Sequence, residues 1–68
     1  MYDIMKVRDM LRILKKDGWV EVRRKGDHRV LKHSAKPGIV VVPGHFSDDL
    51  APGTLKSIRE QARLEGKL

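Results

Sequence analysis

The sequence contains no cysteine, which excludes disulfide bonds and thiolate metal sites. Aromatic residues are also scarce, with one Trp, one Tyr and one Phe. No apolar run approaches the ~20 residues of a membrane-spanning helix, and the N-terminus lacks the apolar core of a signal peptide. These absences exclude a disulfide-stapled secreted mini-protein, and they predict a soluble, cytoplasmic protein without a membrane-spanning segment.

The length of 68 residues leaves room for one domain, which we place at residues 1–68. A chain this short buries a small fraction of its surface, so its core is expected to be thin. It also has too little material for the walls of a deep cleft. Any chemistry is therefore expected on an exposed face or in a shallow groove.

Positive charge is in excess and unevenly spread. Fifteen Lys and Arg stand against nine Asp and Glu, which gives a net charge of +6. Ten of the fifteen lie in residues 1–34, so the excess forms a regional patch. Such a patch favours an anionic partner, whether nucleic acid, an acidic protein or an anionic membrane surface.

The apolar pattern predicts a helix at each end of the chain. Residues 4–16 have the spacing of an amphipathic helix, with Asp3 as the expected N-cap and Gly18 as the residue that ends it. A second helix is expected to begin at Pro52, because proline suits the first helical turn. Its apolar positions are Leu55, Ile58 and Ala62, and Gly66 is expected to stop it.

Three strands are expected between the helices, at residues 19–24, 28–33 and 39–42, followed by a loop at 44–51. The order α-β-β-β-α predicts an α+β fold. Its economical arrangement is a three-stranded antiparallel sheet with both helices on one face. The opposite face of the sheet is then open to solvent. Trp19, at the junction of helix and strand, is expected to be a core anchor rather than a base-stacking residue.

The densest positive charge surrounds a histidine beside a tight turn. His28 follows Gly26-Asp27, and an imidazole can exchange a proton near neutral pH. Cations can hold a phosphate backbone without reading its sequence. The candidate RNA-binding residues are Arg23, Arg24, Lys25, Arg29 and Lys32. These groups could cut RNA, or they could simply bind it.

Metal-free RNA cleavage needs a base for the 2′-OH, an acid for the leaving 5′-oxygen and positive charge at the phosphate. His28 is the best base candidate, but a second proton-transfer group is not obvious. His33 lies about 16 Å along the strand and points to the opposite face, so we expect it to be structural. His45 is expected to be a solvated loop residue, with a contact to a substrate or to a partner protein as the alternative. Three histidines with scattered carboxylates make a weak metal site.

Six segments follow one another in a characteristic order and spacing: Leu14–Trp19, Arg23–His28, Leu31–His33, Lys36–Gly38, Val41–His45 and Leu50–Ile58. They include the Gly-Trp pair after the first helix, the Gly-x-His turn and the Gly-Thr-Leu-x-Ser-Ile opening of the last helix. Together they resemble the HicA toxin family of type II toxin–antitoxin systems. The resemblance covers almost the whole chain, from about Met5 to Leu64.

The resemblance implies a double-stranded-RNA-binding-domain-like fold and an mRNA interferase that cleaves RNA with the histidine of the Gly-x-His turn, here His28. It also implies a HicB-type antitoxin that binds and masks the toxin. We expect RNA and this antitoxin as partners, with no membrane partner and no metal or small-molecule cofactor. The family usually has Ser between this Gly and His, whereas this chain has Asp27. Asp27 could orient the imidazole, tune it or impair it.

Two other functions compete with the endoribonuclease. A non-catalytic RNA-binding module of the same fold would read A-form shape and would need no general base. A protein-interaction domain would dock an acidic partner on the basic face, which is also compatible with a toxin. The Gly-x-His turn favours the endoribonuclease, in which His28 should be largely exposed.

Overall fold

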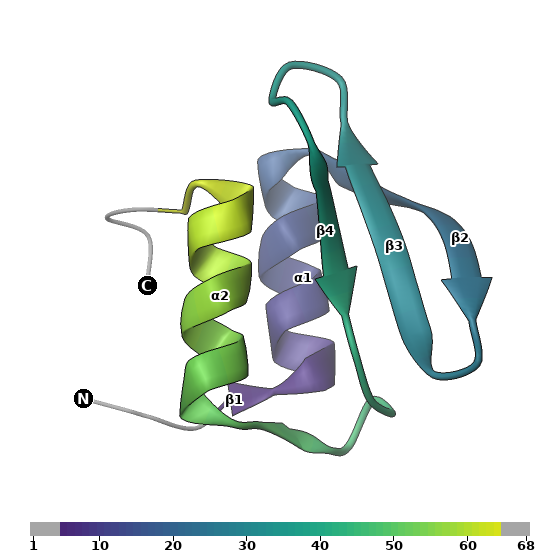
Figure 1. The fold of residues 1–68 in the computed structure, drawn as a ribbon, viewed down its shortest axis with the longest axis vertical. Helices are drawn as coiled ribbons and strands as arrows, with labels where there is room; N and C mark the ends of the chain where they lie inside the picture. The colour runs from purple at the N-terminus through teal and green to yellow at the C-terminus, as the bar shows by residue number, and fades with distance from the viewer. Residues whose placement is uncertain (1–4, 65–68) are drawn as a thin grey trace.

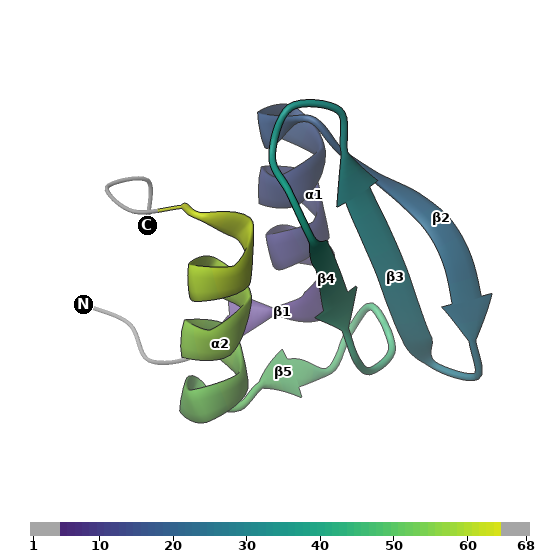
Figure 2. The ribbon, with the colours of Figure 1, turned by 45° about the horizontal axis from the view of Figure 1, so that its top comes forward.

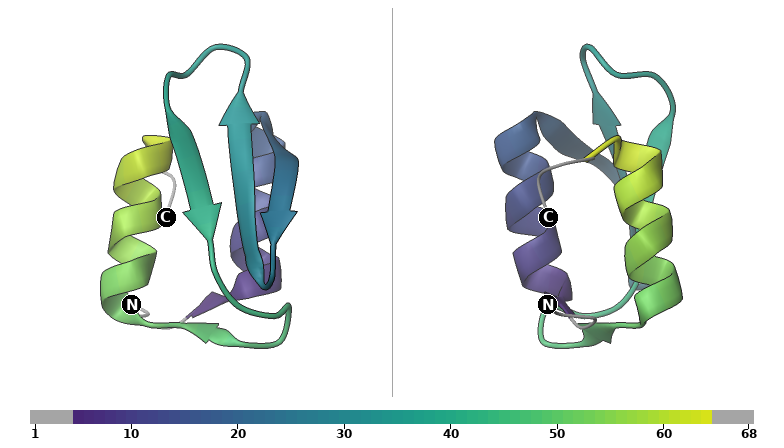
Figure 3. Two further views of the ribbon diagram at one scale, coloured as in Figure 1. Left: turned by 45° about the vertical axis from the view of Figure 1, so that its right-hand side comes forward. Right: turned by 90° about the vertical axis from the view of Figure 1, so that its left-hand side faces the viewer.

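The computed structural model describes residues 5–64, and residues 1–4 and 65–68 lie outside this description. Two helices cover one face of a three-stranded sheet (Figure 1). The elements are β1 (Met5–Lys6), α1 (Val7–Asp17), β2 (Trp19–Lys25), β3 (His28–His33), β4 (Ile39–Val42), β5 (Asp49–Leu50) and α2 (Pro52–Ala62). The predicted α+β class, the three main strands and the placement of both helices on one face are confirmed (Figure 3).

The main sheet has the order β2-β3-β4, with antiparallel pairing throughout. Successive side chains of a strand point to opposite faces, so every second residue of β3 and β4 faces the helices. Leu31, Val40 and Val42 face inward and are fully buried. Trp19 opens β2 and is 1% exposed, which confirms it as a core anchor. Neither helix of the described residues is long and apolar enough to cross a bilayer.

A second, two-stranded sheet was not predicted from the sequence. β1 pairs antiparallel with β5, so that Met5 lies opposite Leu50 and Lys6 lies opposite Asp49 (Figure 2). Lys6 Nζ also donates to Asp49 Oδ1 at 2.9 Å. This small sheet joins the segment before α1 to the segment before α2. The predicted loop at 44–51 therefore contains a strand, and strands of two residues are too short to leave a periodic pattern.

The first helix begins three residues later than predicted, because residues 5 and 6 are extended in β1. The predicted N-cap, Asp3, lies outside the described residues, and Lys6 occupies the N-cap position without a side-chain hydrogen bond. Backbone carbonyls of the loop after β4 replace a side-chain cap. Val7 N–H donates to the Asp48 carbonyl at 2.9 Å, and Arg8 N–H donates to the Phe46 carbonyl at 3.1 Å. The start of α1 is thus held by a distant loop.

The second helix begins at Pro52, as predicted, and buries Leu55, Ile58 and Ala62. It ends at Ala62, where Arg63 adopts a left-handed conformation with φ of 54°. The prediction that Gly66 stops the helix is wrong, and Gly66 itself lies outside the described residues. The Arg63 N–H bonds back to the Glu60 carbonyl at 3.3 Å, as the residue after a helix commonly does.

Gly18 ends α1, as predicted, with φ of 108°. A Cβ atom there would lie 2.6 Å from His33 Nε2, whereas one at Gly26, with φ of 60°, would meet nothing within 4 Å. We expect Gly18→Ala to lower the free energy of unfolding by about 3 kcal/mol, because backbone strain adds to overpacking. Gly26→Ala, with strain alone, should cost about 1 kcal/mol. Urea denaturation of both variants checks this, and equal losses would contradict the role of the His33 contact.

Candidate active site

The predicted catalytic histidine lies at the tip of the β2–β3 hairpin (Figure 1). His28 is the first residue of β3 and pairs with Lys25, the last residue of β2. Its side chain is 56% exposed, so the predicted exposure is confirmed. The tight turn between them contains Gly26 with a positive φ, which glycine adopts without steric cost. The imidazole therefore stands in solvent at the end of a paired hairpin.

Asp27 holds one nitrogen of this imidazole. His28 Nδ1 lies 2.9 Å from Asp27 Oδ1. An ionised carboxylate can only accept a hydrogen bond, so Nδ1 carries the proton and donates. Among residues 5–64, no other side chain or backbone group hydrogen-bonds the His28 ring. Nε2 is consequently the nitrogen with a free lone pair in the neutral ring.

A β-bulge decides which basic residues share a face with His28. The β2–β3 register shifts between Glu21 and Arg23. An extra residue reverses the face on which all following side chains of the strand lie. Without this bulge Arg23 would face the helices, but with it Arg23 lies opposite Val30 on the open face of the sheet. Lys25 reaches the same face beside His28.

The open face therefore carries three of the five predicted RNA-binding residues. Arg23, Lys25 and Lys32 are exposed there, since they share the face of His28 and Val30. Arg24 is also exposed, but it lies on the other face of the hairpin and pairs with Glu21, with Nε 3.3 Å from Oε2. The sequence alone suggested one surface for all five cations. The structure divides them between the two faces of the hairpin.

Arg29 departs most from expectation, because its side chain is buried. The residue is 5% exposed and faces inward with Leu31. Its Nη1 donates to the Gly44 carbonyl at 2.7 Å, and the guanidinium lies 4.6 Å from the centre of the Phe46 ring. Its Nε is 3.8 Å from Glu21 Oε1, an ion pair without a hydrogen bond. Arg29 thus contacts the protein, and it does not lie with the exposed cations.

The loop that Arg29 contacts, residues 43–48, is closed by its own hydrogen bonds. His45 N–H donates to Asp48 Oδ2 at 3.0 Å, and Asp48 N–H donates to the His45 carbonyl at 2.9 Å. Gly44 adopts φ of 95°, which turns the chain away from β4. Two further carbonyls of the loop accept the first N–H groups of α1. The side chain of His45 is exposed, as predicted for a loop residue.

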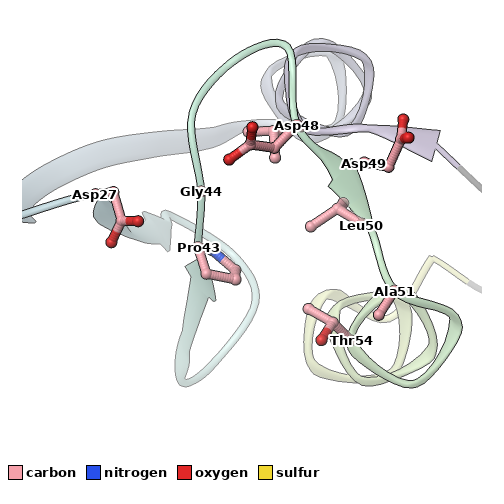
Figure 4. A pocket seen from close by; sticks show the side chains of 9 residues that line it. Asp27, Pro43, Gly44, Asp48, Asp49, Leu50, Ala51 and Thr54 are labelled. Atoms are coloured by element: carbon pink, nitrogen blue, oxygen red, sulfur yellow. The ribbon is translucent and has the colours of Figure 1, made fainter.

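A cavity of about 300 Å³ lies between the hairpin tip and this loop. In Figure 4 Asp27 stands on one side of the Pro43–Gly44 segment, and Leu50, Ala51 and Thr54 lie on the other. Three carboxylates line the cavity, from Asp27, Asp48 and Asp49. Within the described part of the chain no three His, Cys, Asp or Glu side chains are grouped to hold a metal ion. Asp27, which orients the His28 imidazole, is therefore one of the residues that line this cavity.

His33 is structural, as predicted, because both of its nitrogens are occupied. Nδ1 accepts the N–H groups of Ala35 and Lys36, at 2.9 and 3.1 Å. Nε2 must then carry the proton, and it donates to the Asp17 carbonyl at 2.6 Å. The ring also packs edge-on against Trp19, with 5.2 Å between the ring centres. His33 therefore has no nitrogen free for proton transfer.

We expect Arg29→Ala to lower the free energy of unfolding by about 2 kcal/mol, the typical loss for a hydrogen bond from a charged donor. The change also leaves the Gly44 carbonyl without its partner and removes the contact with Phe46. Arg24→Ala is the matched control, because it removes the same guanidinium from an exposed position and should change stability by about 0.5 kcal/mol or less. Urea denaturation compares them, and similar losses would show that Arg29 does not anchor the loop.

A family model described as "HicA toxin of bacterial toxin-antitoxin" matches residues 7–64 of this chain. The match begins with the first residue of α1 and ends two residues after α2. It includes the turn with His28, the bulged strand β2 and the loop at residues 43–48. A search of curated proteins found no match to the chain.

Proposed function

The chain belongs to the HicA toxin family, the toxins of bacterial toxin–antitoxin systems, and on this premise we propose that it is an endoribonuclease that cleaves mRNA through His28. The observation that carries the proposal is the state of the His28 imidazole. It is exposed, it is held at Nδ1 by Asp27, and its Nε2 is free. An oriented imidazole with one free nitrogen is suited to general base catalysis.

The proposed reaction begins with proton transfer from the ribose 2′-OH to His28 Nε2. The 2′-oxygen then attacks the adjacent phosphorus, and the bond from phosphorus to the 5′-oxygen breaks. The products are a 2′,3′-cyclic phosphate and a 5′-hydroxyl. An imidazole base and nearby cations supply what this step needs, so we propose that it proceeds without a metal ion.

Exposed cations on the open face of the sheet are proposed to hold the RNA backbone. Lys25 is the cross-strand partner of His28 and is best placed for the phosphate that reacts. Arg23 and Lys32 lie further along the same face and would hold neighbouring phosphates. Arg29 is left out of this surface because of its burial. Contacts of this kind fix the position of an RNA strand without reading its bases.

A HicB-type antitoxin is the proposed partner, and the same open face is the proposed site of masking. Val20 and Ile39 on this face are 61% and 48% exposed, and they lie among the cations. A partner with acidic and apolar groups would complement this surface and exclude RNA from it. Because mRNA is the proposed substrate, we place the protein in the cytoplasm.

His28→Ala should lower cleavage of a long single-stranded RNA by about 10²-fold or more, since general base catalysis contributes that much. The assay is run with a chelator present, and Lys16→Ala on the exposed surface of α1 serves as the control. Circular dichroism should show all three proteins folded, because the His28 side chain is exposed.

Two outcomes would count against this function. Equal cleavage by the native chain and by His28→Ala would mean that another group, or a contaminant, cuts the RNA. Binding of RNA without cleavage by either protein would favour a non-catalytic RNA-binding module.

Asp27→Ala should lower kcat about fivefold, because an exposed pair of this kind contributes about 1 kcal/mol or less. The imidazole of that variant loses the acceptor that fixes its proton on Nδ1. Asp27→Asn should lower kcat less, since the amide oxygen can accept the same hydrogen bond. Single-turnover cleavage measures both variants. A rise in kcat for Asp27→Ala would show that the carboxylate impairs the histidine.

A further inference from the structure

The proposed reaction lacks a group that protonates the leaving 5′-oxygen, and we infer that His45 is that group. The inference rests on the proposed function, because it assigns the second proton transfer of the same reaction. His33 is excluded by its hydrogen bonds, which occupy both ring nitrogens. His45 is the remaining histidine of the chain. Its imidazole is exposed and has no hydrogen-bond partner among residues 5–64.

The cavity brings the segments of His28 and His45 together. Asp27 and Gly44 both line it, and each is the immediate chain neighbour of one of these histidines. The β3–β4 pairing ends with Arg29 opposite Val42, so the segments that follow β4 and precede β3 leave the sheet side by side. The Arg29 side chain then bonds the Gly44 carbonyl at 2.7 Å. Asp27 and Gly44 therefore place the segments of His28 and His45 on two sides of one cavity.

Rigid support distinguishes His45 from an ordinary loop histidine. Asp48 accepts its backbone N–H and donates to its carbonyl, which fixes the turn on both sides of the residue. Arg29 anchors the preceding residue and packs against the ring of the following residue, Phe46. A proton donor must be held in place before it can act in a transition state. These contacts give the backbone of His45 that support.

The chemistry requires two groups on different segments. In an in-line displacement the attacking 2′-oxygen and the leaving 5′-oxygen lie on opposite sides of the phosphorus. His28 accepts the proton of the 2′-OH, and the imidazolium form of His45 donates a proton to the 5′-oxygen as its bond to phosphorus breaks. The reaction leaves His28 protonated and His45 neutral, so the protons balance. Lys25 cannot replace His45, since it is the direct cross-strand partner of His28 on the base side.

A leaving group that needs no proton tests this assignment. One bond that the native protein cleaves is first located in a long RNA. A short oligoribonucleotide containing that bond is then made in two forms, with oxygen or with sulfur at the 5′ position of the leaving nucleotide. A thiolate leaves without protonation, so the acid should matter only for the oxygen form.

We expect His45→Gln to cleave the oxygen substrate about 10²-fold or more slowly, while its kcat/KM for the sulfur substrate stays within about threefold of native. His28→Ala should be slow on both substrates, since the 2′-OH is unchanged. Ser47→Ala, an exposed change in the same loop, is the matched control and should leave both rates unchanged.

The outcomes separate this inference from the function on which it rests. If His28→Ala cleaves both substrates at the native rate, the proposed function itself fails. If cleavage depends on His28 but His45→Gln loses the same factor on both substrates, His45 acts in binding or folding and is not the acid. An unchanged rate of His45→Gln on the oxygen substrate would also overturn the inference.

Discussion

The hydrogen bond from Arg29 to the Gly44 carbonyl is the contact on which the site depends. A buried guanidinium is costly unless the protein offers it partners, and Arg29 obtains them from two other segments: Glu21 in β2, and Gly44 and Phe46 in the loop after β4. The loop in turn supplies the carbonyls that cap α1. One inward-facing side chain next to His28 therefore fixes the hairpin, the loop and a helix start relative to one another. This suits a short chain that cannot enclose a cleft.

The second constraint is the alternation of side chains between the two faces of the sheet. In β3 the side chains of His28, Val30 and Lys32 lie on the open face, which carries the candidate base. The side chains of Arg29, Leu31 and His33 lie on the inner face, where they contact the rest of the protein. The bulge in β2 decides which side chains of that strand share a face with His28. It allows Glu21 to face inward near Arg29 while Arg23 and Lys25 face outward beside His28. The same residues in regular alternation, without the bulge, would turn Arg23 and Lys25 inward.

Periodic apolar patterns made most of the fold predictable, since α1, α2, β3 and β4 each bury a regular set of side chains, whereas β2 buries Trp19 alone. β1 and β5 escaped prediction because two residues have no period. The division of the five cations also escaped, because a bulge leaves no mark in the order of residues. Arg29 is different: Leu31 two positions later is apolar, and the period of two already placed both residues on the inner face. The dense positive charge around His28 instead favoured grouping Arg29 with the exposed cations.

The three histidines differ in how many ring nitrogens the protein occupies, and this number separates their roles. His33 has both nitrogens bonded, and the result is a fixed neutral ring that stabilises the end of α1 and the turn after β3. His28 has Nδ1 bonded and Nε2 free, which favours a base. His45 has neither nitrogen bonded within residues 5–64, so its ring is free to turn toward a substrate. A base benefits from a fixed tautomer, whereas an acid needs a proton and access to the leaving atom. The hydrogen-bond partners of the two rings therefore favour His28 as the base and His45 as the acid. The position of their two segments around the cavity favours the same assignment.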